Sequence, residues 1–270
     1  MRADVLAACA PWRLALPSRA LAGRFGDRMG RGTGASLEFT EFRDYVPGDD
    51  LRHVDWRAYA RTDALKVRLF RDEVAPHLDV VLDASASLAV TPEKARAALD
   101  LVAALEALAA GSGARARVLA CDGGRLDDAG PVAFSGGDRG TWLPREPLRP
   151  RALRAIVSDF LVADDPAPRL RALAAGAAHV YVVQLLDPWE LAPDLSGPTT
   201  LVDAEDGAHL DLDLAERAVA RYRDRLGRLR DDVARATRAV GGTYALVVAG
   251  DLPRMFAEGL SPQGVVEPAR

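Results

Sequence analysis

The chain lacks several features that would connect it to a particular chemistry. It has two cysteines, Cys9 and Cys121, and four histidines, all isolated in the sequence, so neither a disulfide scaffold nor a zinc site is indicated. The glycine-rich stretch 30–34 has no lysine and no helix signal after it, which argues against a nucleotide-binding phosphate loop. Ser85 lies between two alanines rather than in the Gly-x-Ser-x-Gly turn of a serine hydrolase.

An excess of one charge is also missing. The 35 basic and 39 acidic residues leave a net charge of −4, so the composition does not drive the chain toward nucleic acid or an anionic membrane. Lysine occurs only as Lys66 and Lys94, so nearly all the positive charge is arginine, which reflects a bias of composition. The apolar run 5–16 is interrupted by Pro11 and Arg13 and is too short to span a bilayer. It also lacks the layout of a signal peptide, and we expect a cytoplasmic protein.

Apolar residues are plentiful, at 49% of 270 residues, which is enough for the core of one large or two modest domains. Residues 1–36 are rich in glycine and arginine and are predicted to form an irregular arm. Residues 37–76 combine a Val-Pro-Gly-Asp-Asp turn with a strictly alternating stretch, 66–70, which predicts a small antiparallel β segment. Residues 77–262 are predicted to form the main domain.

The main domain alternates apolar runs of strand length with longer helical patterns. Strands are predicted at 78–82, 117–121, 155–159, 179–186 and 243–248, and helices at 94–110, 168–175 and 212–240. This alternation predicts an α/β fold with a mostly parallel sheet and helices on both of its faces. Ligands of such sheets bind at the carboxyl ends of the strands, where Asp83 and Asp159 lie.

The most informative motif follows the first of these strands. Asp83, Ser85 and Ser87 alternate in one tight turn and offer three hard oxygen ligands, of which only Asp83 is charged. Such donors suit a magnesium-like ion, and neutral hydroxyls would leave that ion able to accept a carboxylate from outside. In the alternative interpretation, the serines cap the following helix and Asp83 merely ends a strand. The motif by itself favours neither.

The predicted helix 212–240 has a regular apolar seam in steps of three and four residues, over roughly four heptads. Packing against the parent sheet explains this seam. A protruding helix that binds a partner is the alternative.

Several motifs together resemble a known bacterial family. They are residues 30–39 (GRGTGASLEF), 43–52 (RDYVPGDDLR), 55–58 (DWRA) and 60–61 (AR), with Glu73 before the motif strand and 187–190 (DPWE) after the fourth strand. These motifs are similar to the bacterial domain-of-unknown-function family fifty-eight. Members of that family resemble von Willebrand factor A domains and are typically encoded beside MoxR-type AAA+ ATPases.

The resemblance implies a Rossmann-like von Willebrand A domain with a metal-ion-dependent adhesion site. In that fold Asp83, Ser85 and Ser87 form the first ligand loop, a threonine comes from a second loop and an aspartate from a third. Asp159 matches the third loop, and Thr141 is the candidate threonine in a second loop that is short in this chain. Mg²⁺ is the ion that the resemblance implies, and a MoxR-type AAA+ ATPase is the partner.

The segment before the main domain has two interpretations. Tyr45, Asp49, Arg52 and Trp56 belong to a concentration of turn formers, charges and aromatic residues that a plain surface loop would not need. In one interpretation Asp49 or Asp50 pairs with Arg52 or Arg57 while Trp56 fills a small core. In the other, these four residues form a docking face for a partner.

The function expected from these patterns is not enzymatic. A dehalogenase-type phosphatase also ends its first strand in an aspartate, but it needs a second acid where this chain has Ser85. We expect an interaction module that holds Mg²⁺ and binds an acidic side chain of a partner, acting with the ATPase in complex assembly or cofactor maturation. The alternative is salt-sensitive nucleic-acid binding by a basic arm. That arm contains Arg13, Arg19, Arg24, Arg28 and Arg31.

Overall fold

A computed structural model of the chain describes residues 2–16, 37–46, 54–72, 77–121, 123–126, 132–135, 143–161, 164–195, 197–212 and 215–269. The chain divides into two compact units. One unit contains Met1–Phe25 and Pro76–Arg270, and the other contains Gly26–Ala75.

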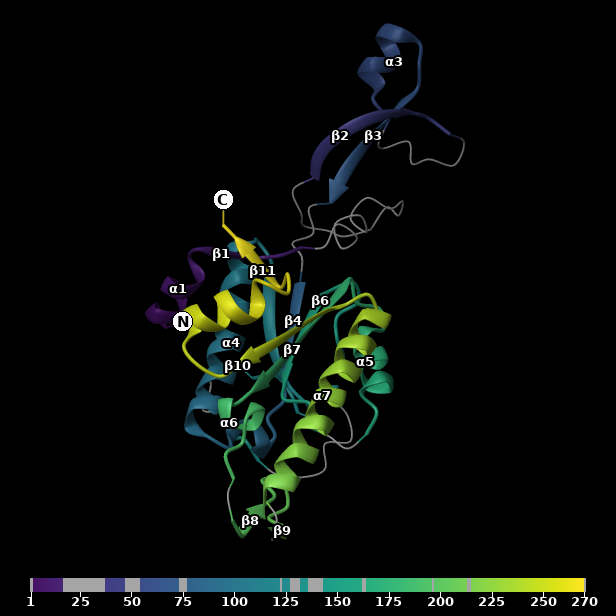
Figure 1. The fold of residues 1–270 in the computed structure, drawn as a ribbon. Coiled ribbons are helices and arrows are strands. Elements are labelled where there is room, and N and C mark those ends of the chain that lie inside the picture. Colours follow the sequence, from purple (N-terminus) through teal and green to yellow (C-terminus); the bar gives the residue numbers. More distant parts are fainter. Residues whose placement is uncertain are drawn as a thin grey trace. The chain divides into compact units, whose positions relative to one another are not determined.

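Five parallel strands form the central sheet of the first unit (Figure 1). Their order across the sheet is β10 (Thr243–Val248), β7 (His179–Leu186), β6 (Leu153–Ser158), β4 (His77–Leu82) and β5 (Arg115–Ala120). Every residue of β6 and all but the first of β4 are buried, because helices cover both faces of a parallel sheet. The predicted α/β class and parallel sheet are therefore confirmed, and the architecture is Rossmann-like.

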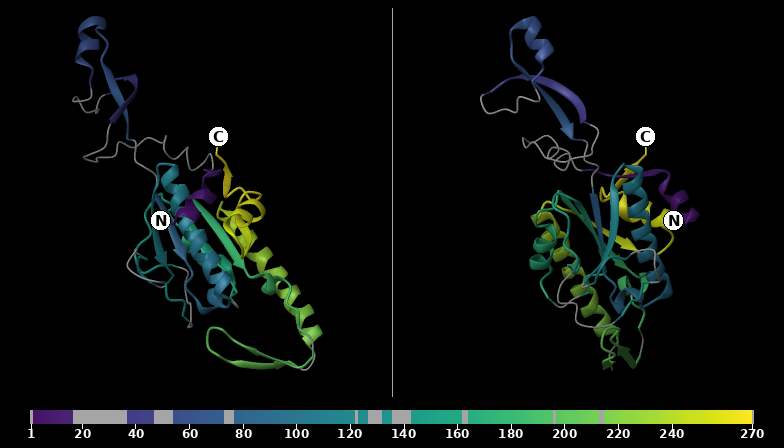
Figure 2. Two further views of the ribbon diagram at one scale, coloured as in Figure 1. Left: turned by 90° about the vertical axis from the view of Figure 1, so that its left-hand side faces the viewer. Right: turned by 180° about the vertical axis from the view of Figure 1, so that it is seen from behind.

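Two layers of helices cover this sheet (Figures 1 and 2). The main helices are α1 (Ala3–Cys9), α4 (Pro92–Gly111), α5 (Pro166–Ala174) and α7 (Ala215–Ala239). Helices α1 and α4 lie on one face, and α5 and α7 lie on the other. Helix α4 begins at Thr91, whose hydroxyl accepts a hydrogen bond from the Lys94 backbone N–H at 3.1 Å, with Pro92 in the first turn.

Both ends of the chain pack onto the α4 side of the sheet. Strand β1 (Trp12–Leu14) pairs with the antiparallel strand β11 (Val266–Pro268), which follows the helical turns α8 (Leu252–Arg254) and η3 (Met255–Leu260). Val5 and Leu14 are buried in the same core as α4, and Trp12 stacks on Phe256 with 5.8 Å between ring centroids. Residues 3–14 therefore belong to the main unit and not to an irregular arm, and that unit extends past residue 262.

The apolar seam of α7 faces the body of its own unit. Leu226, Val233 and Ala236 are buried, and Val233 and Ala236 share a core with Val180 and Val182 of β7. Packing on the parent sheet is therefore confirmed as the explanation of the seam.

The second unit is a small antiparallel β segment with one short helix. Strand β2 (Leu37–Asp44) pairs with β3 (Lys66–Asp72), and α3 (Trp56–Thr62) lies between them in the sequence. The Asp55 carboxylate caps the start of α3: it accepts hydrogen bonds from the backbone N–H groups of Arg57 and Ala58, each at 3.0 Å. The antiparallel pair predicted in this part of the chain is confirmed.

A short helix and a hairpin follow β7 at the end of the sheet where the strands finish. They are α6 (Pro188–Leu191) and the antiparallel pair of β8 (Thr199–Val202) and β9 (His209–Leu212) (Figure 1). A further short helical turn, η2 (Ala86–Ala89), follows β4. None of the helices in the described residues has both the length and the apolar content needed to cross a membrane.

Candidate functional site

The strand order places a switch point between β4 and β6. The chain runs from β4 to its neighbour β5 and then returns to form β6 on the other side of β4. In open α/β sheets, such a point opens a crevice at the carboxyl ends of the two strands. Asp83 follows β4 and Asp159 follows β6, and the backbone N–H of Asp83 donates to the carbonyl of Val157 at 2.9 Å. The two aspartates are therefore brought to the same crevice.

Asp83 is a buried carboxylate whose described hydrogen-bond donors are neutral. The hydroxyl of Ser158 donates to its Oδ2 at 2.7 Å, and the backbone N–H of Ser85 donates to its Oδ1 at 3.1 Å. Burial, and then the nearby negative charge of Asp159, raise the pKa of Asp83 above its ordinary value. The environment of Asp83 thus disfavours its charged form, and a bound cation would stabilise that form.

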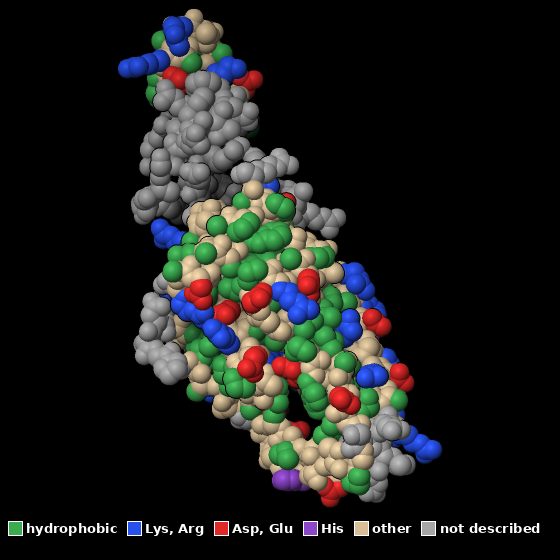
Figure 3. Space-filling model, turned by 60° about the vertical axis from the view of Figure 1, so that its left-hand side comes forward, with side chains coloured by type: hydrophobic (Ala, Val, Ile, Leu, Met, Phe, Trp, Pro, Cys, Tyr) green, Lys and Arg blue, Asp and Glu red, His purple; other side chains and the backbone are tan. Residues whose placement is uncertain are grey.

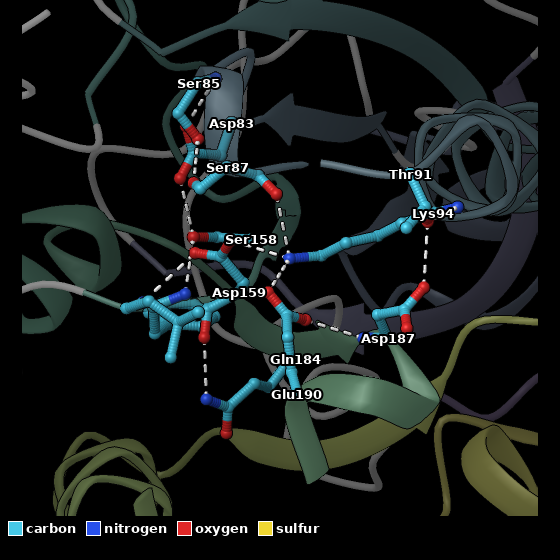
Figure 4. A network of polar contacts seen from close by, with 12 residues as sticks. Asp83, Ser85, Ser87, Thr91, Lys94, Ser158, Asp159, Gln184, Asp187 and Glu190 are labelled. Carbon is cyan, nitrogen blue, oxygen red and sulfur yellow. Dashed lines mark hydrogen bonds and ion pairs between the residues drawn. The ribbon is translucent and has the colours of Figure 1, made fainter. Parts of the chain in front are cut away.

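The two serines of the motif lie beside this carboxylate (Figure 4). Their Oγ atoms are 3.0 Å apart and share one hydrogen bond. The capping interpretation of these serines is wrong: the side chain of Ser85 makes no cap to η2, and the following long helix, α4, is capped by Thr91. The motif therefore presents one carboxylate and two hydroxyls together, as the sequence predicted.

A buried lysine occupies the space next to this motif (Figure 4). The Lys94 Nζ donates to Glu190 Oε1 at 2.7 Å, to Asp159 Oδ2 at 2.9 Å and to the carbonyl of Ser87 at 3.0 Å. Its side chain is 0% exposed, and these three bonds use all the protons of an ammonium group. Sequence reasoning missed this residue. The spacing of Lys94 in its helix was the available signal. Lys94 precedes Ala97 by three residues and Leu101 by seven, which places it on the apolar, buried face of α4.

The third side of the site is the start of α6. Asp187 accepts the hydroxyl of Thr91 at 2.8 Å and the backbone N–H of Trp189 at 2.9 Å, while Glu190 Oε2 accepts the backbone N–H of Asp187 at 2.7 Å. This capping box fixes the Glu190 carboxylate against Lys94. Burial raises the pKa of Glu190 even though the Lys94 ammonium lowers it.

The buried charges of the site do not balance. Asp83, Asp159, Asp187 and Glu190 are each less than a tenth exposed, and in the described part of the chain the Lys94 ammonium pairs with two of them, Asp159 and Glu190. Within the described ranges, no group of three or more His, Cys, Asp and Glu side chains is arranged to hold a metal ion. An ion at Asp83 would therefore depend on the serine hydroxyls.

The second ligand loop is only partly described. Thr141, its candidate threonine, lies outside the described residues. Among the described residues of the β5–β6 connection, Ser135 reaches the motif: its backbone N–H donates to the Ala84 carbonyl at 3.0 Å, and it forms a β-bridge with Ser85. No periodic pattern of residues predicts this contact, because a single bridged residue is too short to form a strand pattern.

The proposed docking residues of the second unit are only partly described. Asp49 and Arg52 lie outside the described residues, whereas Tyr45 is half-buried and its backbone N–H donates to the Leu65 carbonyl at 2.9 Å. Trp56 is 55% exposed and meets the ring of Tyr59 edge-on. The interpretation that Trp56 fills a small core is therefore wrong.

The basic arm proposed for nucleic acid is also partly described. Arg13 pairs with Glu267 at 3.0 Å across β1 and β11, and the other four arginines lie outside the described residues. On the face of the molecule seen in Figure 3, basic and acidic side chains are interspersed over the described part.

Comparisons with known proteins identify a family but no activity. The family described as "Protein of unknown function DUF58" matches residues 41–131 and 143–232. The chain is 31% identical over 251 residues to the uncharacterised protein Rv1480 of Mycobacterium tuberculosis, which covers 83% of this chain and 75% of the relative. The uncharacterised protein Mb1516 of Mycobacterium bovis matches to the same extent. No solved structure matches the chain.

Proposed function

Because the chain belongs to the DUF58 family, whose description assigns no activity, we propose its function from the geometry of the site: a non-enzymatic module that binds a partner through a divalent ion. The observation on which this rests is the group formed by Asp83, Ser85 and Ser87 at the switch point of the sheet. The ion would be held there by the Asp83 carboxylate and the two serine hydroxyls.

The donor set fits a hard cation such as Mg²⁺, which prefers oxygen ligands and usually retains several waters. Asp83 supplies the one negative charge, and an ion would offset the excess of buried carboxylates around Lys94. Asp159 is already bonded to Lys94 and to the backbone N–H of Leu161, so it would assist through water. The chemistry that the ion supplies is Lewis acidity toward an incoming carboxylate.

The surroundings of the site suit a protein partner. Val90, Leu161 and Trp189 are 50%, 36% and 48% exposed, and each lies within three residues of a side chain or backbone group of the site. An exposed tryptophan beside a charged anchor is typical of residues that dominate binding energy. An acidic side chain of the partner would bind the ion, and apolar side chains next to it in the partner would contact Val90, Leu161 and Trp189. The family resemblance suggests a MoxR-type AAA+ ATPase as that partner, acting with this protein in complex assembly or cofactor maturation.

The test is recovery of the ATPase by the immobilised full-length chain, with Mg²⁺ or with a chelator. The wild type should retain the ATPase only with Mg²⁺, and Asp83→Ala should retain it under neither condition. Asp164→Ala is the control, since Asp164 is an exposed acid on the loop after β6, the strand next to β4, and is not one of the proposed ligands. Equal recovery by the wild type and Asp83→Ala, with and without chelator, would refute bridging through a metal.

A further inference from the structure

The β8–β9 hairpin sends one acidic side chain onto the serine motif. Glu205 Oε1 accepts the backbone N–H of Ser87 at 2.8 Å, across 118 residues of sequence. The contact reaches the residue whose hydroxyl is a proposed ligand and whose carbonyl accepts the Lys94 ammonium. An acidic group of this chain therefore lies beside the motif to which the proposed function brings an acidic group of a partner.

The turn that presents Glu205 is held by its own hydrogen bonds. Asp203 Oδ1 accepts the backbone N–H groups of Glu205 at 2.7 Å and Asp206 at 3.3 Å, and the Asp203 N–H donates to the Ala208 carbonyl at 2.8 Å. Gly207 has a φ of 75°, a left-handed conformation that favours glycine. The tip is thus a defined structure that points one carboxylate at the site.

The second oxygen of this carboxylate has no partner in the described part of the chain. Glu205 Oε2 is buried and accepts no hydrogen bond there. Buried carboxylate oxygens are normally bonded, because removing one from water without a partner is unfavourable. A cation bound by Asp83, Ser85 and Ser87 would supply the missing partner. The unpartnered Glu205 oxygen is therefore an observation that supports a cation independently of the motif.

We infer that Glu205 is an internal ligand of the ion at Asp83, Ser85 and Ser87, so that the β8–β9 hairpin occupies the coordination position that a partner's carboxylate must take. This inference rests on the proposed function and adds its regulation. The site is closed by the chain's own hairpin until the hairpin is displaced. Val202 and Leu210 on the hairpin, 59% and 58% exposed, offer a partner an apolar surface by which to displace it.

The experiment uses Mn²⁺ as the probe, with the full-length wild type, Glu205→Gln, Asp83→Ala and Asp211→Asn. Asp211 is the matched control, because it is an exposed acid on the same hairpin that accepts the Thr200 hydroxyl at 2.7 Å. Affinity is measured by electron paramagnetic resonance, and the water bound to the ion by the proton relaxation rate of the solvent. Hydrogen exchange of residues 199–212 is followed with and without Mg²⁺.

Glu205→Gln should bind Mn²⁺ at least about tenfold more weakly, the lower end of the loss seen when a supporting group of a metal site is removed. Each bound ion should then relax solvent water faster, because water replaces the carboxylate. Mg²⁺ should slow exchange in the hairpin of the wild type and of Asp211→Asn, but not of Glu205→Gln.

Two results would overturn the inference and leave the metal site standing. In both results Asp83→Ala has lost Mn²⁺ binding. In the first, Glu205→Gln has the Mn²⁺ affinity and the solvent relaxation of the wild type. In the second, Glu205→Gln binds Mn²⁺ more weakly, but each bound ion relaxes solvent water as in the wild type. If the wild type binds no Mn²⁺, or Asp83→Ala binds it as the wild type does, the proposed function fails and the inference fails with it.

Discussion

Replacing Lys94 by methionine should strongly destabilise the first unit. Methionine has a similar length but no charge, so the change removes three hydrogen bonds of 2.7–3.0 Å and leaves Asp159 and Glu190 buried beside each other without their cation. Breaking a buried ion pair from one side lowers the free energy of unfolding by about 3–5 kcal/mol. That is a large part of the roughly 5–15 kcal/mol by which a domain is usually stable.

The assay is urea unfolding followed by circular dichroism, with two companion variants. Lys94→Met/Glu190→Gln removes one of the stranded charges and should recover at least about 1 kcal/mol relative to Lys94→Met, as expected for coupled neighbours. Arg254→Met removes an ion pair to Glu258 whose side chains are about two-thirds exposed, and it should change stability by less than about 1 kcal/mol. Lys94 does not stabilise the unit by neutralising Asp159 and Glu190 if Lys94→Met costs no more than Arg254→Met, or if the double variant is no more stable than Lys94→Met.

Two further predictions concern groups away from the site. Asp79→Ala should lower the free energy of unfolding by about 1.5–3 kcal/mol, because buried Arg117 loses bonds to Asp79 of 2.7 and 3.0 Å but keeps its ion pair to Glu146. The same change should leave Mn²⁺ affinity unchanged, and a parallel loss of metal binding would contradict a metal site confined to the ligands at Asp83. At pH 8 neither thiol of the folded chain should react with a disulfide reagent, because Cys9 and Cys121 are buried. Burial also raises the pKa of Cys9 to about 11, so little of Cys9 is thiolate at pH 8. Both thiols should react in urea, and rapid reaction of the folded chain would argue against the described packing.

The sheet could be predicted from the sequence because its strands are continuous apolar runs with clear ends. The predictions at 179–186 and 243–248 have the bounds of β7 and β10, and the predicted helix 94–110 differs from α4 by two residues at its start and one at its end. The predicted irregular arm is wrong for residues 3–14, because the glycine and arginine that predict it lie further along the chain. The buried pair Val5 and Cys9, one helical turn apart, was the local signal that was available.

The site was predictable only where strand register determines it. Asp83 and Asp159 each follow a strand of the parallel sheet, so the α/β pattern places both at the carboxyl edge, and the pairing of β4 with β6 makes them neighbours. Lys94, Glu190 and Glu205 reach the site through packing of helices and a hairpin, across 65 to 118 residues of sequence. No local pattern specifies such contacts, and a lone charged residue on a helix or in a turn is usually solvated.

Whether Asp83, Ser85 and Ser87 hold a divalent ion can be seen by diffraction from crystals soaked in Mn²⁺. Anomalous difference maps should show one ion bonded to the Asp83 carboxylate and to the hydroxyls of Ser85 and Ser87, with the Lys94 ammonium still bound to Asp159 and Glu190. A map with no ion at these oxygens, in crystals where Mn²⁺ is present at saturating concentration, would contradict the account.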